Sequence, residues 1–230
     1  MRDTNMTDEW VKAQWAKNPC VKLANGDIRT GPVRLSFPNI LKPGKPTQQK
    51  PDGGYGAVLL FPKRVDISVL QKEMRDVALA KWPQAGQKGG PKLFNPIRDQ
   101  DIDGKGNPGE AERYAGYELG AMRIGANANQ KVPCVDQRLA PIVDESKVYP
   151  GVWAICTVRC YTFERDGNKG PTFGLQAVMI VADDTNIGGT GSASPQEAFA
   201  GVAIDAGDIN PDAAFGAGPK QEAAEVDPFA

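Results

Sequence analysis

The densest apolar run of the chain, GVWAICTVRCYTF at residues 151–163, also contains the side chains best suited to binding chemistry. Strand side chains alternate between two faces, so one face of this predicted strand carries Trp153, Arg159, Tyr161 and Phe163. Aromatic rings stack on bases and arginine contacts phosphates, which makes this face a candidate surface for single-stranded nucleic acid. A second core layer or an oligomer interface would explain the same pattern equally well.

The opposite face of this strand carries two of the four cysteines, Cys156 and Cys160. Four residues of strand separate them by about 13 Å, whereas a disulfide requires Cα atoms within about 7 Å. Two thiolate ligands of one zinc ion must also lie closer together than this. We therefore predict that these cysteines are reduced core residues, as expected in a cytoplasmic chain without a secretory signal.

The chain contains no histidine, which excludes histidine-dependent nucleophilic catalysis and histidine-ligated zinc. It also lacks a glycine-rich phosphate loop and a nucleophile elbow. We predict that the protein is not an enzyme and uses no cofactor.

Residues 99–110, DQDIDGKGNPGE, fit the letters of an EF-hand calcium loop. Asp99, Asp101, Asp103 and Glu110 would be its ligands. Pro96 interrupts the helix that should precede such a loop, and Gly106 occupies a position that is normally apolar. We therefore predict an exposed polar turn and no metal site.

Periodicity and turn residues predict a mainly β chain with one main helix and long loops. Asp66 caps a helical pattern over 67–82, in which Leu70, Met74 and Val77 share a face. The turn ERDGNKGP at 164–171 joins two alternating runs and predicts a hairpin. The remaining predicted elements are a short helix over 7–18, a strand region over 26–41 broken by Pro32 and Pro38, a basic loop over 42–54, a strand over 55–62, an excursion over 83–113 and a strand over 117–128.

Charge divides the chain into a basic body and an acidic tail. Residues 1–183 contain 26 basic and 20 acidic side chains, whereas 184–230 contain eight acids and one base, Lys220. This asymmetry is typical of a body that binds a polyanion. We predict one domain over 1–183 and a disordered low-complexity tail over 184–230. No apolar run reaches the roughly 20 residues of a membrane span, so no membrane association is expected.

Several short motifs resemble a family of phage single-stranded DNA-binding proteins with an OB-fold. The motifs are Pro96–Asp99, Asn127–Asn129, Val135–Pro141, Tyr149–Gly151 and Gly167–Gly170, within a resemblance that covers about residues 30–200. The resemblance implies a five-stranded OB-type barrel that coats single-stranded DNA during phage replication and recombination, in the cytoplasm of the host cell. The C-terminal Asp227, Pro228 and Phe229 resemble the acidic tips through which such proteins recruit replication or recombination partners.

We expect Trp153, Tyr161 and Phe163 to stack on bases of single-stranded DNA. The residues expected to contact phosphates are Arg159, Arg123, Lys131, Arg98 and Lys169, with Lys42, Lys45 and Lys50 forming a flexible clamp. The tail would occupy the basic groove weakly when DNA is absent. Two alternatives stay open: a strand-annealing recombination factor that also binds duplex DNA, and a structural protein whose aromatic face forms an oligomer interface, such as a homodimer.

Overall fold

The computed structural model describes residues 8–46, 48, 50–101, 117 and 121–188. The first compact unit of the chain spans Met1–Gly189. The elements are α1 (Asp8–Lys17), β1 (Val21–Lys22), β2 (Ile28–Asn39), β3 (Tyr55–Phe61), α2 (Ser68–Lys81), β4 (Ile97–Asp99), β5 (Met122–Ala128), β6 (Cys134–Val135), the 3-10 helix η2 (Glu145–Lys147), β7 (Trp153–Arg165) and β8 (Asn168–Ala182).

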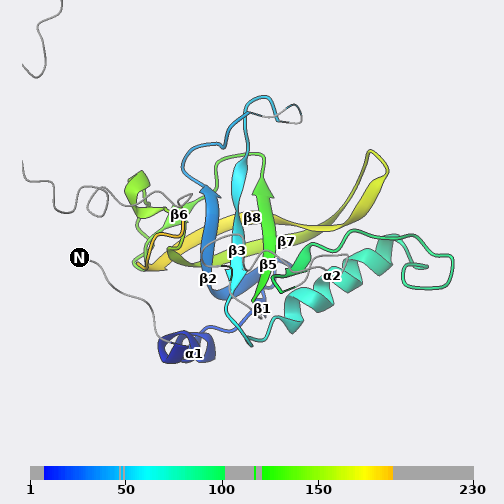
Figure 1. The fold of residues 1–230 in the computed structure, drawn as a ribbon, viewed down its shortest axis with the longest axis horizontal. Coiled ribbons are helices and arrows are strands. Elements are labelled where there is room, and N and C mark those ends of the chain that lie inside the picture. The colour runs from blue at the N-terminus through cyan, green and yellow to red at the C-terminus, as the bar shows by residue number, and fades with distance from the viewer. Residues whose placement is uncertain (1–7, 47, 49, 102–116, 118–120, 189–230) are drawn as a thin grey trace, which may run out of the picture. The chain divides into compact units, whose positions relative to one another are not determined.

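Five of the strands close into a barrel (Figure 1). Antiparallel pairing joins β5 to β3, β3 to β2, β2 to β7 and β7 to β8. A short parallel pairing of β5 with β8, at Ala126↔Phe173 and Asn127↔Gly174, closes the ring. This is the topology of an OB-fold barrel, with β2, β3, β5, β7 and β8 as its first to fifth strands, so the predicted fold class is confirmed.

The first barrel strand, β2, runs continuously through both of its prolines, where the sequence predicted breaks. The pairing register shifts between Arg29 and Pro32 on the β7 side, and between Ser36 and Asn39 on the β3 side. Bulges tolerate proline because the ladder is already interrupted there. The prolines therefore bend this strand without ending it.

The predicted hairpin is confirmed as β7 and β8, whose distal half projects beyond the barrel (Figure 1). Asp166 and Gly167 form the two-residue turn, with φ values of 51° and 77°. Two successive positive φ values define a type I′ turn, which Asp-Gly favours because its twist matches that of the strands.

Both predicted helices are present, and each packs through its apolar face. Leu70 of α2 is fully buried, and Met74 and Val77 pack against the core beside it. In α1, the Trp15 ring lies so close to Gly31 that an added Cβ there would be 2.7 Å from it. The Trp15 indole also donates a hydrogen bond of 2.8 Å to the Pro32 carbonyl. Neither helix is long and apolar enough to cross a membrane, nor is any other helix among the described residues.

The hydrophobic core consists of aliphatic side chains together with Phe61, Phe173, Trp15, Trp153 and the cysteines. All four cysteines are buried and free, which confirms the prediction for Cys156 and Cys160. Burial raises the pKa of Cys160 to about 12 and that of Cys134 to about 11. These thiols are therefore protonated core residues.

Candidate nucleic-acid interface

The outer face of the sheet is defined by strand register. Leu35, Leu59, Ile124 and Ile97 come from adjacent strands and point into the core. The neighbouring residues on each strand point outward, because side chains alternate. Register aligns them into one row across five strands, which we call the arginine row: Arg98, Arg123, Leu60, Arg34 and Trp153.

The floor beside the arginine row contains two glycines, Gly125 and Gly56. Gly125 of β5 pairs with Val58, and one step further along the strand Asn127 pairs with Gly56. Within the described structure, an added Cβ at Gly125 would meet no atom within 4 Å. Since neither packing nor a positive φ requires glycine here, the absent side chain leaves room for a ligand to approach the backbone. The outer face of the second and third strands is also where OB-folds bind oligonucleotides.

Tyr161 lies at the hairpin end of this floor. Its side chain is 46% exposed, and an added Cβ at Gly174 would lie 3.1 Å from its ring and 3.6 Å from the Asn127 carbonyl oxygen. The ring therefore stands near the seam where β8 meets β5, with one side open to solvent.

A second aromatic group joins the hairpin to the segment before β4. Phe94 and Phe163 make an edge contact, with ring centroids 5.8 Å apart, and the Arg98 guanidinium lies 5.1 Å from the centre of the Phe94 ring. Phe94 is 40% exposed. We call Phe94, Arg98, Tyr161 and Phe163 the hairpin cluster. It combines exposed rings with a cation, the combination used to bind single strands.

Gly170 allows the Phe94 segment to reach the hairpin. An added Cβ at Gly170 would lie 2.7 Å from the Phe94 carbonyl oxygen and 2.8 Å from its nitrogen. The Phe94 amide donates a hydrogen bond of 2.8 Å to the Lys169 carbonyl. The last glycine of the GNKG motif is thus required by close backbone packing, and Lys169 itself is half-buried beside the cluster.

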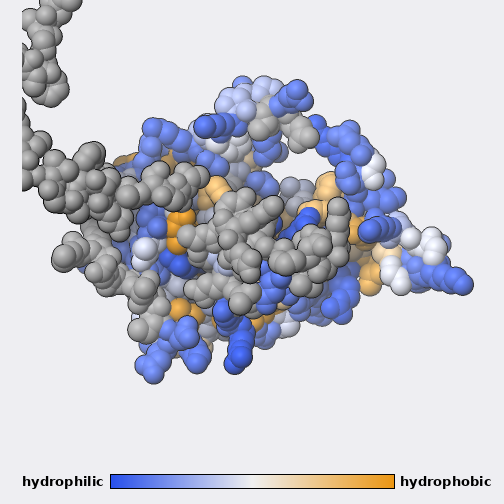
Figure 2. Space-filling view, viewed as in Figure 1, coloured by the Kyte–Doolittle hydropathy of each residue, from blue (hydrophilic) through white to orange (hydrophobic). Residues whose placement is uncertain are grey.

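Charges near the hairpin tip alternate in sign. The ammonium groups of Lys169 and Lys81 each lie 4.0 Å from Glu164. Arg159 donates a hydrogen bond of 2.6 Å to the nearly buried Asp27 and is otherwise half-exposed. Figure 2 shows hydrophilic residues over the projecting hairpin, with hydrophobic residues visible only in small patches. Arg159 is therefore held in place by an acid while part of its guanidinium stays accessible.

Trp153 does not join the hairpin cluster, although strand alternation grouped it with Tyr161 and Phe163. It is 4% exposed, and Trp10 of α1 packs edge-on against it at 5.6 Å. Its indole donates a hydrogen bond of 2.7 Å to Asp184. The ring is therefore covered in this structure and is not available for stacking on a base.

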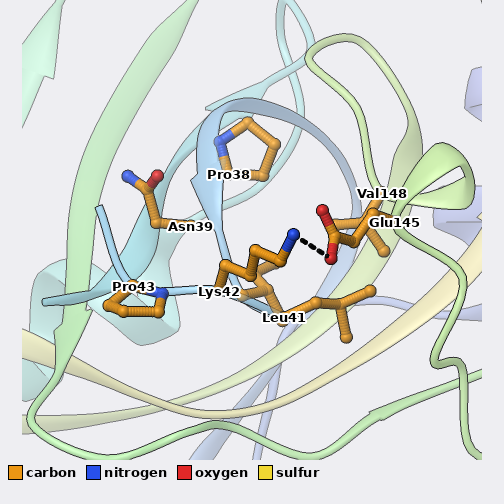
Figure 3. A pocket seen from close by; sticks show the side chains of 8 residues that line it. Pro38, Asn39, Leu41, Lys42, Pro43, Glu145 and Val148 are labelled. Atoms are coloured by element: carbon orange, nitrogen blue, oxygen red, sulfur yellow. Dashed lines mark ion pairs between the residues drawn. The ribbon is translucent and has the colours of Figure 1, made fainter. Parts of the chain in front are cut away.

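The three lysines of the 42–54 loop differ in their surroundings. Lys42 forms an ion pair of 2.7 Å with Glu145 at a small cavity beneath the loop, where Figure 3 shows the two side chains pointing toward each other. Lys45 is exposed, and Lys50 is half-buried. This loop joins the first two barrel strands, one of the two OB-fold loops that flank the binding face. Lys131 follows β5 and is exposed.

The residues that fit the calcium-loop pattern lie only partly within the described residues. Asp99 ends β4, and its carboxylate accepts a hydrogen bond of 2.8 Å from the Asp101 amide. Asp103 and Glu110 lie outside the described residues, as do Asp227, Pro228 and Phe229 of the tail. In the described part of the chain, no group of three or more acids or cysteines is placed to hold a metal ion.

The segment after β8, residues 183–188, is fixed to the barrel by the predicted Tyr149–Gly151 motif. Tyr149 donates a hydrogen bond of 2.9 Å to the Asp184 carbonyl, and Ile187 donates one of 3.0 Å to the Pro150 carbonyl. Arg34 donates to the Thr185 carbonyl at 2.9 Å. Residues 184–187 are therefore hydrogen-bonded to the barrel.

Sequence reasoning missed Phe94, Gly125 and Arg34. Phe94 lies in a segment without periodicity, and Arg34 joins the arginine row only through strand register. Gly125 carried the one available signal, because an isolated glycine inside a strand pattern suggests a bulge or a close approach to the backbone.

The barrel and the aromatic and basic side chains on its outer face define the class of OB-fold binding proteins. The chain belongs to the family described as "Enterobacter phage Enc34, ssDNA-binding protein", whose model matches residues 26–209.

Solved structures agree with this fold. The single-stranded DNA-binding protein from bacteriophage Enc34 in complex with ssDNA is 21% identical, with a TM-score of 0.57, over 74% of this chain and 93% of that one. The same phage protein in a second structure is 22% identical, with a TM-score of 0.55, over 78% and 93% of the two chains. Comparison with curated proteins gave no match.

Proposed function

We propose that the protein binds single-stranded DNA along the outer face of β3 and β5, from the hairpin cluster to the arginine row. The observation that carries this proposal is the floor at Gly125, where an added Cβ would meet no described residue and which lies between exposed rings and arginines. Family membership and the ssDNA complex of the Enc34 phage protein support it. The proposed role is binding during phage replication and recombination, without catalysis.

Each group has a separate part in this proposal. Tyr161, Phe163 and Phe94 stack on bases, at about 1–3 kcal/mol each. Arg98, Arg123, Lys169 and the accessible part of Arg159 contact phosphates, and Lys131, Lys45, Lys50 and Lys42 extend the basic surface. Lys42 must first leave Glu145, which costs little because an exposed ion pair contributes at most about 1 kcal/mol.

The decisive experiment is a titration of labelled oligo(dT) by fluorescence anisotropy at several salt concentrations. Binding should weaken as salt rises, with a slope of log K against log[salt] of about −0.7 per phosphate contact. The double substitution Tyr161→Ala/Phe163→Ala should weaken binding at least tenfold, whereas Leu139→Ala, an exposed residue remote from the cluster, should not.

Two other outcomes would favour the alternatives. Equal affinity for duplex and single-stranded DNA at matched salt would favour a strand-annealing factor. Absence of binding, together with a concentration-dependent dimer that Tyr161→Ala/Phe163→Ala disrupts, would identify an interaction surface instead.

We further propose that the acidic tail lowers DNA affinity and that its tip, Asp227–Phe229, recruits replication or recombination proteins. Beyond Gly188 the chain carries seven acids and one base, which favours competition with DNA for a basic surface. Ending the chain after Gly189 should tighten DNA binding, most strongly at low salt. Unchanged or weaker binding would count against the tail proposal.

A further inference from the structure

A larger cavity lies between α1 and the barrel, at the end of the arginine row opposite the hairpin cluster. Its volume is about 730 Å³, within the range of ligand pockets. Trp15 and Val11 of α1 form part of its wall, with Leu60 and Phe61 from the end of β3. α1 lies at the end of β2 and β3 opposite the 42–54 loop (Figure 1). The cavity is thus outside the hairpin and loop surfaces described above.

The rim of this cavity carries three exposed cations from two different elements. Lys12 comes from α1, and Lys63 and Arg64 come from the turn between β3 and α2. None of the three forms an ion pair with another described residue. Arg64 has a φ of 60°, a left-handed conformation that costs a residue with a side chain about 1 kcal/mol or more. The turn therefore keeps an arginine at the rim where glycine would be less strained.

Three acids also line the cavity, and two of them are already engaged. Asp66 accepts a hydrogen bond of 2.8 Å from the Ser68 amide at the start of α2. The side chain of Asp184 is 4% exposed, accepts a hydrogen bond from the Trp153 indole and lies 3.7 Å from Arg34. Asp8 is exposed in the first turn of α1. Arg34 and Asp184 pair with each other, so the exposed charged groups at the rim are three cations and two carboxylates, an excess of one positive charge.

The arginine row connects this cavity to the binding face. Leu60 and Arg34 belong both to the row and to the cavity lining. Neighbouring strands lie about 4.8 Å apart, so the row spans about 19 Å from β4 to β7. A strand of DNA that crosses β4 at Arg98, β5 at Arg123 and β3 at Leu60 therefore reaches the cavity without leaving the outer face.

We propose that this cavity is a second contact site for single-stranded DNA, in which Lys12, Lys63 and Arg64 bind backbone phosphates and the apolar wall contacts a base. The proposal rests on the proposed function. An acidic peptide is the other chemistry that such a cavity could accept, but continuity with the arginine row favours DNA.

The test uses oligo(dT) of 6 to 30 nucleotides. The substitutions Lys12→Gln, Lys63→Gln and Arg64→Asn are combined in one variant, which we call the rim variant. Asparagine is chosen because it tolerates the left-handed conformation. The control variant combines Lys88→Gln, Lys147→Gln and Arg75→Asn, which remove the same charge from exposed positions elsewhere. Equal thermal midpoints of the two variants show that both are folded.

We expect the rim variant to bind the shortest oligonucleotides as the wild type does, and the longest ones at least tenfold more weakly. Loss of three phosphate contacts should reduce the steepness of log K against log[salt] by about two for long oligonucleotides only. The control variant should show neither length-dependent change.

If the wild type binds short oligonucleotides and the rim variant shows no length-dependent loss of affinity, this proposal is overturned and the proposed function is not. Binding of a peptide with the sequence of residues 217–230 to the wild type but not to the rim variant, with DNA affinity unchanged, would make the cavity a peptide site and overturn it as well. Failure of the wild type to bind any oligonucleotide would overturn the proposed function first.

Discussion

At the scale of single residues, the glycines of the outer face have two different physical roles. At Gly170 the missing side chain is required by protein packing, because the Phe94 backbone occupies that space. At Gly125 the space is open within the described structure. Only the second kind of glycine leaves room for a ligand, so the two positions should respond differently to substitution.

Gly125→Val should separate binding from stability. Valine favours strands and meets no described neighbour here, so the free energy of unfolding should stay the same or rise by up to about 1 kcal/mol. The isopropyl group would stand where DNA is proposed to approach, and affinity for oligo(dT) should fall at least tenfold. Thr157→Val on the outer face of β7 is the control. Unchanged affinity of Gly125→Val in the anisotropy titration would place the DNA elsewhere.

Gly170→Ala should detach the Phe94 segment from the hairpin. The added methyl group clashes with the Phe94 backbone, so the hydrogen bond from the Phe94 amide to Lys169 is expected to open. Hydrogen exchange at the Phe94 amide should accelerate at least tenfold, with several-fold weaker DNA binding. Exchange at the Val158 amide, in the barrel core, is the internal reference. Wild-type exchange at Phe94 would contradict this account of the motif.

At the scale of elements, residues 183–188, which follow β8, connect β2 and β7 through hydrogen bonds and an ion pair. The Asp184 carboxylate accepts a hydrogen bond from the Trp153 indole and forms an ion pair with Arg34. Burial together with the neighbouring acids raises the pKa of Tyr149. Gly151, with a φ of 104°, lets the Thr185 carbonyl approach so closely that no side chain fits.

Asp184→Ala should lower the free energy of unfolding by about 2–4 kcal/mol, because Arg34 and the Trp153 indole lose their buried partner. Asp183→Ala removes the same charge from an exposed neighbour and should cost less than about 1 kcal/mol. Urea denaturation measures both. Similar losses for the two variants would contradict a specific role for Asp184.

At the scale of the whole molecule, local sequence signals predicted the five barrel strands, both helices and the hairpin between β7 and β8, whereas β4 lies inside the excursion expected over 83–113. They could not predict the closing contact between Ala126 and Phe173, because pairing between residues so far apart depends on the complete barrel. The burial of Trp153 has the same origin. Alternation along β7 assigned it correctly to the outer face, but α1, more than 130 residues earlier in the sequence, covers that part of the face.

Thiol reactivity tests the packing of the whole barrel. Burial raises the pKa of Cys20 and Cys134 to about 11 and that of Cys160 to about 12, and it raises that of Cys156 further. Because each folded-state pKa lies above the ordinary value of 9.0, the folded chain should keep its thiols protonated at pH 8 to 9. A disulfide reagent at pH 8 should therefore modify all four thiols of the denatured chain. Without denaturant, it should modify none of them rapidly. Fast modification of the native chain would show that a barrel wall opens.

Because the four native thiols are buried, spectroscopic probes can be attached to this chain at chosen positions. A single cysteine introduced at an exposed position, such as Lys88 or Ser146, would be the only sulfur that a maleimide dye reaches in the native protein. Two such positions labelled in turn would report distances to a fluorescent oligonucleotide without any native cysteine being removed. The same burial that keeps these four thiols unreactive in the native protein would then make the path of the DNA across the barrel measurable.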